Sequence, residues 1–279
     1  MSTTGPAASF SSSKYLVEQL QAALNQLASI IPGSGKRPVG LRKSGEIFEI
    51  QVDGRTLWAP GPRRWRMYRK GIDARLEQVG RRYGLHDVYP SGKGQWVVDV
   101  GGYMGEWSLL MLRRGFNVLV IEPDPNAAFC LKKNLEAHAP AGSTWLHEPR
   151  VALNEKKTVQ FYAEPINADG SIFPSDKHRS KAITIEADRL DQIVAERIGD
   201  QVVHAFKMDA EGAEPEVLQG ATKVLEHCER IGIDAGAERM GEATVDDCRK
   251  ILTAAGFTFL EGHAPSDMVV VARKAKSHA

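Results

Sequence analysis

The chain has 279 residues, of which 42% are hydrophobic and 25% are charged, and its formal net charge at pH 7 is +1. This length can bury a proper core in one large domain or in a domain with a cap, and the composition is that of an ordinary globular protein. The nearly neutral charge argues against a nucleic-acid partner, which would demand a broad basic face.

The cysteines and the apolar runs exclude further classes of protein. Cys130, Cys228 and Cys248 are widely spaced and form no C-x-x-C pair or Cys/His cluster, so we expect neither a zinc site nor a disulfide framework. The N-terminus lacks the basic and apolar stretches of a signal peptide. No apolar run approaches the roughly 20 residues that cross a bilayer. We therefore expect a cytoplasmic protein without a membrane partner.

The first part of the chain predicts a disordered tail and then a helix. Residues 1–13 are small and polar, a composition typical of disorder. From Lys14 to Ile31 the apolar residues recur at helical spacing, and Pro32 ends the predicted helix. The apolar stripe of this helix can bury against the core of its own chain or against a second subunit, which leaves a homodimer open.

A linker, a hairpin and a basic segment follow. Residues 32–40 are typical of a linker, and residues 46–60 predict two strands around the turn Asp53-Gly54. Residues 63–82 predict a basic helical segment that is broken at Gly71. This segment is either a solvated surface or a cap over a site that attracts an anionic substrate. Its Trp65 and Tyr68 can stack on a ring or serve as packing residues.

Residues 97–125, VVDVGGYMGEWSLLMLRRGFNVLVIEPDP, are the most informative segment. An apolar run reaches Asp99, and a tight turn follows that contains three glycines: Gly101, Gly102 and Gly105. A helical stretch leads to a second apolar run, which stops at Glu122. This order predicts a βαβ unit that binds a nucleoside-containing cofactor. Glu122, at the tip of the second strand, is placed to accept hydrogen bonds from two ribose hydroxyls.

The spacing of the turn distinguishes between cofactors. A dinucleotide favours G-x-G-x-x-G and a helix start without negative charge, whereas this turn has the spacing G-G-x-x-G and Glu106 begins the helix. Asp99 suits a cationic group better than a phosphate. S-adenosylmethionine carries a ribose, an ammonium and a sulfonium but no phosphate, so the sequence favours it over NAD(P).

Alternating strands and helices complete the chain and predict a doubly wound α/β sheet with an antiparallel edge strand. Residues 167–180 form a polar loop that is long enough for a lid. A strand reaches Met208, and one helix is expected from Pro215 to Cys228. Thr244 with Asp247 three residues later predicts the start of a helix, and Gly256 ends it. The last two strands are expected within residues 257–274.

Acidic residues follow the strand that ends at Met208, on the edge of the sheet where ligands bind. Glu214 fits a helix cap or a favourable position near the helix dipole. Asp209 and Glu211 precede the helix and are better placed to face the cleft. Asp209 and Asp234 end adjacent core strands, and with Glu238 nearby they offer an alternative Mg²⁺ site of oxygen ligands. The sequence does not settle whether a metal is needed.

DVGGYMGEWS followed by IEPDP, with KMDAEGAEPEVLQGA later in the chain, resembles the FkbM family of S-adenosylmethionine-dependent methyltransferases over about residues 46–273. The resemblance implies a Rossmann-like, seven-stranded class I methyltransferase domain at residues 83–275 behind a cap at residues 14–82. It also implies O-methylation of a hydroxyl on a sugar or small natural product, as in secondary metabolite biosynthesis. The family turn often reads D-V-G-A-N-x-G, and Gly102 and Tyr103 replace its Ala and Asn here.

We predict one set of residues for the cofactor and another for catalysis. The cofactor set is Asp99, Gly101, Gly102, Tyr103, Gly105, Glu106, Glu122 and Pro123. Asp209 is the first candidate for positioning or deprotonating a hydroxyl acceptor, and Glu211 is the second. Glu148 and Arg150 are alternative adenine contacts. Two other functions remain open at this point: an NAD(P)-dependent oxidoreductase, and a cofactor-binding protein without catalysis.

Overall fold

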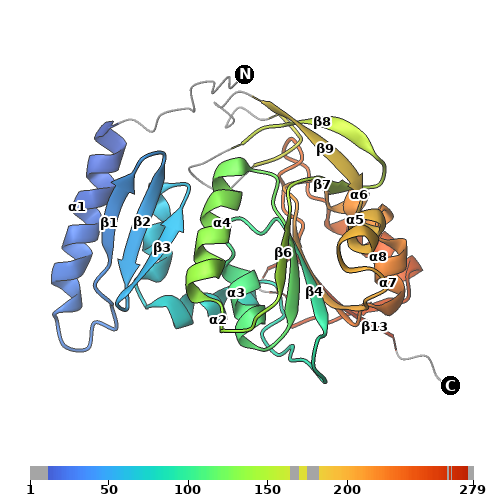
Figure 1. Ribbon diagram of the computed structural model, residues 1–279, viewed down its shortest axis with the longest axis horizontal. Helices are drawn as coiled ribbons and strands as arrows, with labels where there is room; N and C mark the ends of the chain where they lie inside the picture. Colours follow the sequence, from blue (N-terminus) through green and yellow to red (C-terminus); the bar gives the residue numbers. More distant parts are fainter. Residues whose placement is uncertain (1–11, 164–169, 175–181, 263, 265, 276–279) are drawn as a thin grey trace.

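A computed structural model describes residues 12–163, 170–174, 182–262, 264 and 266–275 (Figure 1). The predicted disordered tail lies outside these residues, except for its last two residues, which begin a helix. Of the predicted lid at residues 167–180, only residues 170–174 are described. None of the helices in the described ranges is long and apolar enough to cross a membrane.

The largest sheet has seven strands in the order β12-β13-β11-β10-β4-β5-β6. Neighbouring strands are parallel, except that β13 runs antiparallel to both β11 and β12. The doubly wound α/β sheet is thus confirmed, but the antiparallel strand lies one place inside the edge. The strands are β4 (Trp96–Val100), β5 (Asn117–Ile121), β6 (Trp145–Glu148), β10 (Val203–Asp209), β11 (Arg230–Asp234), β12 (Phe257–Phe259) and β13 (Val269–Lys274).

Helices cover both faces of this sheet (Figure 1). Every residue of β4 is buried, as expected for a central strand with helices on both sides. The helices of the first face are α2 (Ile72–Arg82), α3 (Glu106–Arg113) and α4 (Pro125–His138); those of the second face are α5 (Leu190–Ile198), α6 (Glu214–Gln219), α7 (Thr222–His227) and α8 (Val245–Ala254).

One helix prediction needs correction. The single helix expected from Pro215 to Cys228 is two helices, α6 and α7, which meet at Gly220. A Cβ on Gly220 would lie 1.8 Å from the carbonyl oxygen of Leu153, so only glycine fits where these two segments of the chain approach each other. The predicted helix start at Thr244 is confirmed: Thr244 is the N-cap residue of α8, and its hydroxyl donates to Glu214 at 2.7 Å.

The cap, residues 12–82, begins with α1 (Ser12–Ser29) and continues with a three-stranded antiparallel sheet. Its strands are β1 (Gly40–Ser44), β2 (Ile47–Val52) and β3 (Arg55–Ala59), followed by the 3₁₀ helix η1 (Pro62–Tyr68) and by α2. The predicted hairpin is confirmed as β2 and β3, and the predicted break at Gly71 separates η1 from α2. Strand β1 was not predicted, because its short sequence GLRKS carries a single large apolar residue.

Asn134 of α4 attaches the cap sheet to the first face of the central sheet. Its side-chain oxygen accepts the backbone N–H of Trp58 at 2.9 Å, and its side-chain nitrogen donates to the carbonyl of the same residue at 2.8 Å. The same nitrogen also donates to the carbonyl of Met104 at 2.9 Å. One buried amide therefore joins β3 to the turn before α3.

Two of the strands between β6 and α5 in the chain do not belong to the central sheet. They pair as β8 (Lys157–Phe161) and β9 (Ile183–Arg189), and β9 also pairs with β7 (Val151–Leu153). This small sheet lies beside the carboxyl ends of the central strands (Figure 1). It supplies part of the wall of the candidate site.

Candidate active site

A cavity of about 320 Å³ lies at the carboxyl ends of β4, β5 and β10. Eight of the ten predicted site residues line it: Gly101, Gly102, Tyr103, Glu106, Glu122, Pro123, Asp209 and Glu211. The cap contributes Arg64, Arg75 and Arg82, and Tyr83 follows the cap directly; the segments around the small sheet contribute Val151, Ala152, Phe161, Gly170 and Ile172. The cavity thus joins the cap, the central sheet and the small sheet.

The glycine turn after β4 forms the floor of this cavity. The N–H groups of Gly101 and Gly102 both donate to the carbonyl of Ile121, at 3.0 and 3.2 Å. Gly101 has a φ of +74°, and a Cβ there would lie 1.9 Å from the carbonyl oxygen of Asp209. Only glycine allows this conformation together with so close an approach. Gly105 has a φ of +85°, is the N-cap residue of α3 and does not line the cavity.

Glu122, directly after β5, presents a buried carboxyl group to the cavity. One of its oxygens accepts the backbone N–H of Tyr103 at 2.6 Å, and the other accepts that of Asp124 at 2.8 Å. Burial, assisted by the nearby Asp124, raises the pKa of Glu122 to about 8. Since a carboxylate oxygen can accept two hydrogen bonds, each oxygen keeps one free position for a ligand hydroxyl.

Tyr103 adopts a backbone conformation that is rare for a residue with a side chain. Its φ is +48°, which costs on the order of 1–3 kcal/mol and is typical of functional sites. This conformation directs its N–H to Glu122. The guanidinium of Arg64 lies 4.8 Å from the centre of the Tyr103 ring, so the ring stands between the cap and the glycine turn.

Asp99 lies behind the wall of the cavity. It is fully buried, accepts the hydroxyl of Ser108 at 2.6 Å and pairs with Lys207 at 3.1 Å. Lys207 also donates to the carbonyls of Val100 and Gly101. The predicted ionic contact between Asp99 and a cationic donor stays a prediction. In this structure Asp99 orients the lysine that holds the glycine turn.

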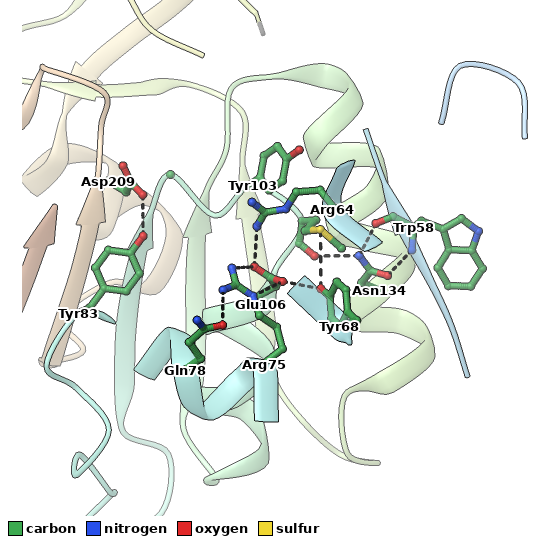
Figure 2. Close-up of polar contacts among 12 residues, drawn as sticks. Trp58, Arg64, Tyr68, Arg75, Gln78, Tyr83, Tyr103, Glu106, Asn134 and Asp209 are labelled. Atoms are coloured by element: carbon green, nitrogen blue, oxygen red, sulfur yellow. Dashed lines mark hydrogen bonds and ion pairs between the residues drawn. The ribbon is translucent and has the colours of Figure 1, made fainter. Parts of the chain in front are cut away.

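Asp209 ends β10 and lines the cavity together with Tyr83, the residue directly after α2. The phenol of Tyr83 donates to Asp209 Oδ2 at 2.6 Å (Figure 2). Burial and the neighbouring Asp209 raise the pKa of Tyr83 well above its ordinary value, so the phenol stays protonated and remains a donor. The other carboxylate oxygen of Asp209 is not used by this bond.

The alternative magnesium site is not supported. Asp209 and Asp234 are register partners on β10 and β11, but Asp234 is ion-paired with Arg82. An arginine therefore occupies the neighbourhood of the second carboxylate. Within the described ranges, no cluster of three or more His, Cys, Asp and Glu side chains is arranged to hold a metal ion.

Glu106, the first residue of α3, connects the central domain to the cap (Figure 2). Its carboxylate accepts hydrogen bonds from Arg64 at 2.8 Å, from Arg75 at 2.8 and 2.7 Å, and from the phenol of Tyr68. Burial alone would raise the pKa of Glu106, but Arg75 and Arg64 hold it well below its ordinary value. The residue is therefore ionised, and its predicted contact with a cofactor stays untested.

The turn after β10 is shaped by two other acidic residues. Glu211 has a φ of +49° and lines the cavity, and its carbonyl accepts the hydroxyl of Ser171 at 2.7 Å. Glu214 is fully buried and accepts the N–H groups of Ala210 and Gly212 at 3.1 and 3.0 Å. Burial raises its pKa to about 7. The predicted capping role of Glu214 is wrong, because Ala213 occupies the N-cap position and Glu214 is the first residue of α6; its favourable position near the helix dipole stays a prediction.

The alternative adenine contacts, Glu148 and Arg150, do not line the cavity. They form an ion pair at 2.8 Å, which Asp188 and Glu196 extend. The cavity residues that were absent from the predicted set include Arg64, Arg75, Tyr83 and Lys207. The first two belong to the basic segment, whose interpretation as a cap over the site is supported by its place in the wall. Tyr83 and Lys207 carried no spacing signal, because tertiary packing alone brings them to Asp209 and Asp99.

This chain is similar to several known proteins. "Methyltransferase 1" of Beauveria bassiana (strain ARSEF 2860) is 23% identical over 186 residues, which cover 57% of this chain and 74% of that protein. The solved FkbM methyltransferase of Methylobacillus flagellatus KT is 20% identical with a TM-score of 0.49 and covers 71% of this chain. This chain spans 49% of that protein.

A third similarity is to the magnesium protoporphyrin IX methyltransferase of Synechocystis PCC 6803, which is 12% identical with a TM-score of 0.42 and covers 73% of this chain and 78% of the other. The family described as "Methyltransferase FkbM domain" matches residues 99–259, more than half of the chain. These residues include the glycine turn, Glu122 and Asp209. The chain belongs to the FkbM family of S-adenosylmethionine-dependent methyltransferases.

Proposed function

We propose that this protein methylates a hydroxyl group of a small molecule, a sugar or natural product, with S-adenosylmethionine as the methyl donor. The observation that carries the proposal is the placement of two acidic side chains in one cavity. Glu122 and Asp209 follow and end strands on either side of β4 and line the same cavity beside the Gly101-Gly102 turn. One is suited to holding a nucleoside and the other to receiving a proton.

The residues around the glycine turn fit this donor. Glu122 would hold the two ribose hydroxyls with the free positions of its two oxygens. The turn has the spacing G-G-x-x-G, whereas a dinucleotide favours G-x-G-x-x-G. Bound S-adenosylmethionine would supply a methyl group that its sulfonium has already activated.

Asp209 is the residue we assign to the acceptor. A hydroxyl group has a pKa far above neutral, so its proton must pass to a base as the oxygen attacks. Tyr83 fixes one oxygen of Asp209 through the 2.6 Å hydrogen bond, which leaves the other oxygen to accept the proton. Glu211, on the same turn, is the second candidate for this role.

The acceptor would enter against the cap. Arg64, Arg75 and Tyr83 line the cavity from this side, and their side chains come from a segment that does not contribute to the glycine turn. Because Glu106 pairs with two of these arginines, one positive charge remains in this part of the wall. We therefore expect an acceptor that is neutral or anionic.

Calorimetry and a turnover screen test the proposal. We expect S-adenosylmethionine to bind and NAD and NADP to give no heat of binding, because the family and the turn both disfavour a dinucleotide. Methyl transfer from radiolabelled donor to a panel of sugars and phenolic or alcoholic natural products should then identify the acceptor. Binding of the nicotinamide cofactor alone would contradict the proposal. Donor binding without transfer to any acceptor would favour a non-catalytic cofactor-binding protein.

The raised pKa of Glu122 predicts a pH-dependent donor affinity. The ribose hydroxyls favour the ionised carboxylate, so at pH 7, below the pKa of about 8, donor binding should release a proton from Glu122. Affinity should rise with pH and become constant above pH about 8. In Glu122→Gln the proton release should disappear and the affinity should fall by a factor of about 10–100, as for the loss of a charged hydrogen bond. Calorimetry in buffers of different ionisation enthalpy measures both quantities.

Replacement of Tyr83 by phenylalanine should reduce turnover without weakening donor binding. Without its phenol Asp209 loses the hydrogen bond that orients it, and we expect kcat to fall about tenfold, as for a typical hydrogen bond. Tyr89→Phe is the matched control, because Tyr89 is 65% exposed and does not line the cavity. Unchanged kcat in Tyr83→Phe together with an unchanged pH profile would remove Tyr83 from the positioning of the base.

A further inference from the structure

Helix α1 turns its apolar side away from its own chain. Seven of the thirteen exposed large apolar side chains in the described part of the chain fall between residues 16 and 31: Leu16, Val17, Leu20, Leu24, Leu27, Ile30 and Ile31. Their exposed fractions range from 52% to 77%. An apolar patch of this kind on a protein surface marks an interaction site.

The opposite side of α1 is polar and is held by the cap. Glu18 is 4% exposed and accepts hydrogen bonds from Trp65 at 3.1 Å and from Arg66 at 3.0 and 2.9 Å. Asn25 donates to the carbonyl of Arg37 at 2.8 Å. The helix is therefore fixed by its polar side, and it cannot rotate to bury its leucines without losing these bonds.

The outward stripe has the spacing of a coiled-coil seam. Val17, Leu20, Leu24, Leu27 and Ile31 are separated by three, four, three and four residues, which is the a/d pattern of two helices that pack together. The small residues Ala23 and Ala28 flank the seam and allow close approach. Figure 1 shows α1 at the outer edge of the molecule, with β1 on its inner side.

The charges of α1 favour a second copy of this chain as the partner. The helix contains two charged residues, Lys14 in its first turn and the buried Glu18. The seam of a symmetric pair would thus bring no like charges together. Helices that lie on membranes carry many lysines and arginines on the polar face, whereas α1 has Lys14 alone and uses its polar face on its own sheet.

We propose that the protein forms a symmetric dimer in which the outer faces of two α1 helices pack against each other. The same surface would serve both subunits, as in other isologous interfaces. Glu18 binds Trp65 and Arg66 of η1, and the neighbouring Arg64 lines the cavity. The interface would therefore support the cap from the side opposite the active site.

Sedimentation equilibrium of the full chain tests this dimer. We expect twice the chain mass of 30.6 kDa at micromolar concentration. The variant Leu20→Glu/Leu24→Glu should show the mass of one chain, with the circular dichroism and melting curve of the folded protein, because both side chains are exposed. Val202→Glu/Met268→Glu makes the same chemical change at residues that are 41% and 49% exposed outside α1, and it should stay dimeric.

Crosslinking locates the interface independently. Leu24 is the midpoint of the stripe from Val17 to Ile31, so in a symmetric pair it meets its own copy. The native cysteines are all buried, so mild oxidation of Leu24→Cys should give a covalent dimer while Val202→Cys stays uncrosslinked. A wild-type chain of single mass would overturn the proposal, and so would a dimer that survives the glutamate pair. A single-mass chain that floats with neutral phosphatidylcholine vesicles would identify lipid as the occupant instead.

Discussion

Asp209→Asn should reduce kcat by about 10²- to 10⁴-fold, the range expected when a general base is removed. The asparagine keeps the size of the side chain and can still accept the phenol of Tyr83 through its carbonyl oxygen, so the fold of the site is retained. It cannot take up the proton of the acceptor. Donor affinity, measured by calorimetry, should be unchanged, since Glu122 and the glycine turn are not altered.

Asp234→Asn is the matched control for this variant. Asp234 is the register partner of Asp209 on the adjacent strand, but it is paired with Arg82 and does not line the cavity. Its replacement should change kcat by only a few fold. Wild-type turnover in Asp209→Asn would remove Asp209 from the mechanism. Equal losses in both variants would instead indicate that the two carboxylates act together, as the magnesium alternative requires.

Glu106→Ala should lower the free energy of unfolding by about 3–5 kcal/mol, because it leaves two largely buried guanidinium groups without their counterion. Arg64 and Arg75 are 17% and 10% exposed, so water cannot replace the lost carboxylate. Tyr68 loses its acceptor in the same variant. Urea unfolding monitored by tryptophan fluorescence measures the difference.

Glu49→Ala provides the comparison. Glu49 is also 9% exposed, but its partner Arg42 is 68% exposed, so we expect its loss of ion pairing to cost less than about 1 kcal/mol. The loss in free energy of unfolding should therefore be clearly larger in Glu106→Ala than in Glu49→Ala. Similar small losses in both variants would show that the Glu106 cluster does not hold the cap.

The same cluster predicts a dependence on acid. The pKa of Glu106 is lowered in the folded protein, so its contribution to stability is present above the unfolded value of about 4.3. It is lost as pH falls below that value and through the folded pKa. The difference in unfolding free energy between wild type and Glu106→Gln should therefore shrink below pH about 4. A constant difference down to pH 3 would contradict this assignment.

The sequence predicts the central sheet well because its strands and turns carry local signals. The glycine turn, the terminal hairpin and the break at Gly71 each follow from residues that are close together in the chain. Strand β1 was missed because its short sequence carries a single large apolar residue. The division at Gly220 was missed because it depends on a distant partner, the carbonyl of Leu153.

In the candidate site, too, residues with a local signal were predicted and residues placed by distant contacts were missed. The acidic residues at the strand ends, Glu122 and Asp209, were predicted from their positions and line the cavity. Asp99 was predicted by the same argument, yet it faces Lys207 on the neighbouring strand. The position of a residue along a strand predicts at which edge of the sheet it lies, but it does not predict toward which neighbour its side chain points. The hydrogen bond from Tyr83 to Asp209 spans 126 positions and left no pattern in the sequence.

The close approach of Gly101 to the carbonyl of Asp209 limits the substitutions that the glycine turn tolerates. A methyl group at position 101 would lie 1.9 Å from the carbonyl oxygen of Asp209. Alanine therefore fits at this position only if the backbone after β10 moves away. A substitution at Gly101 is thus tolerated only together with a change in the turn after β10, so the two turns are structurally dependent on each other.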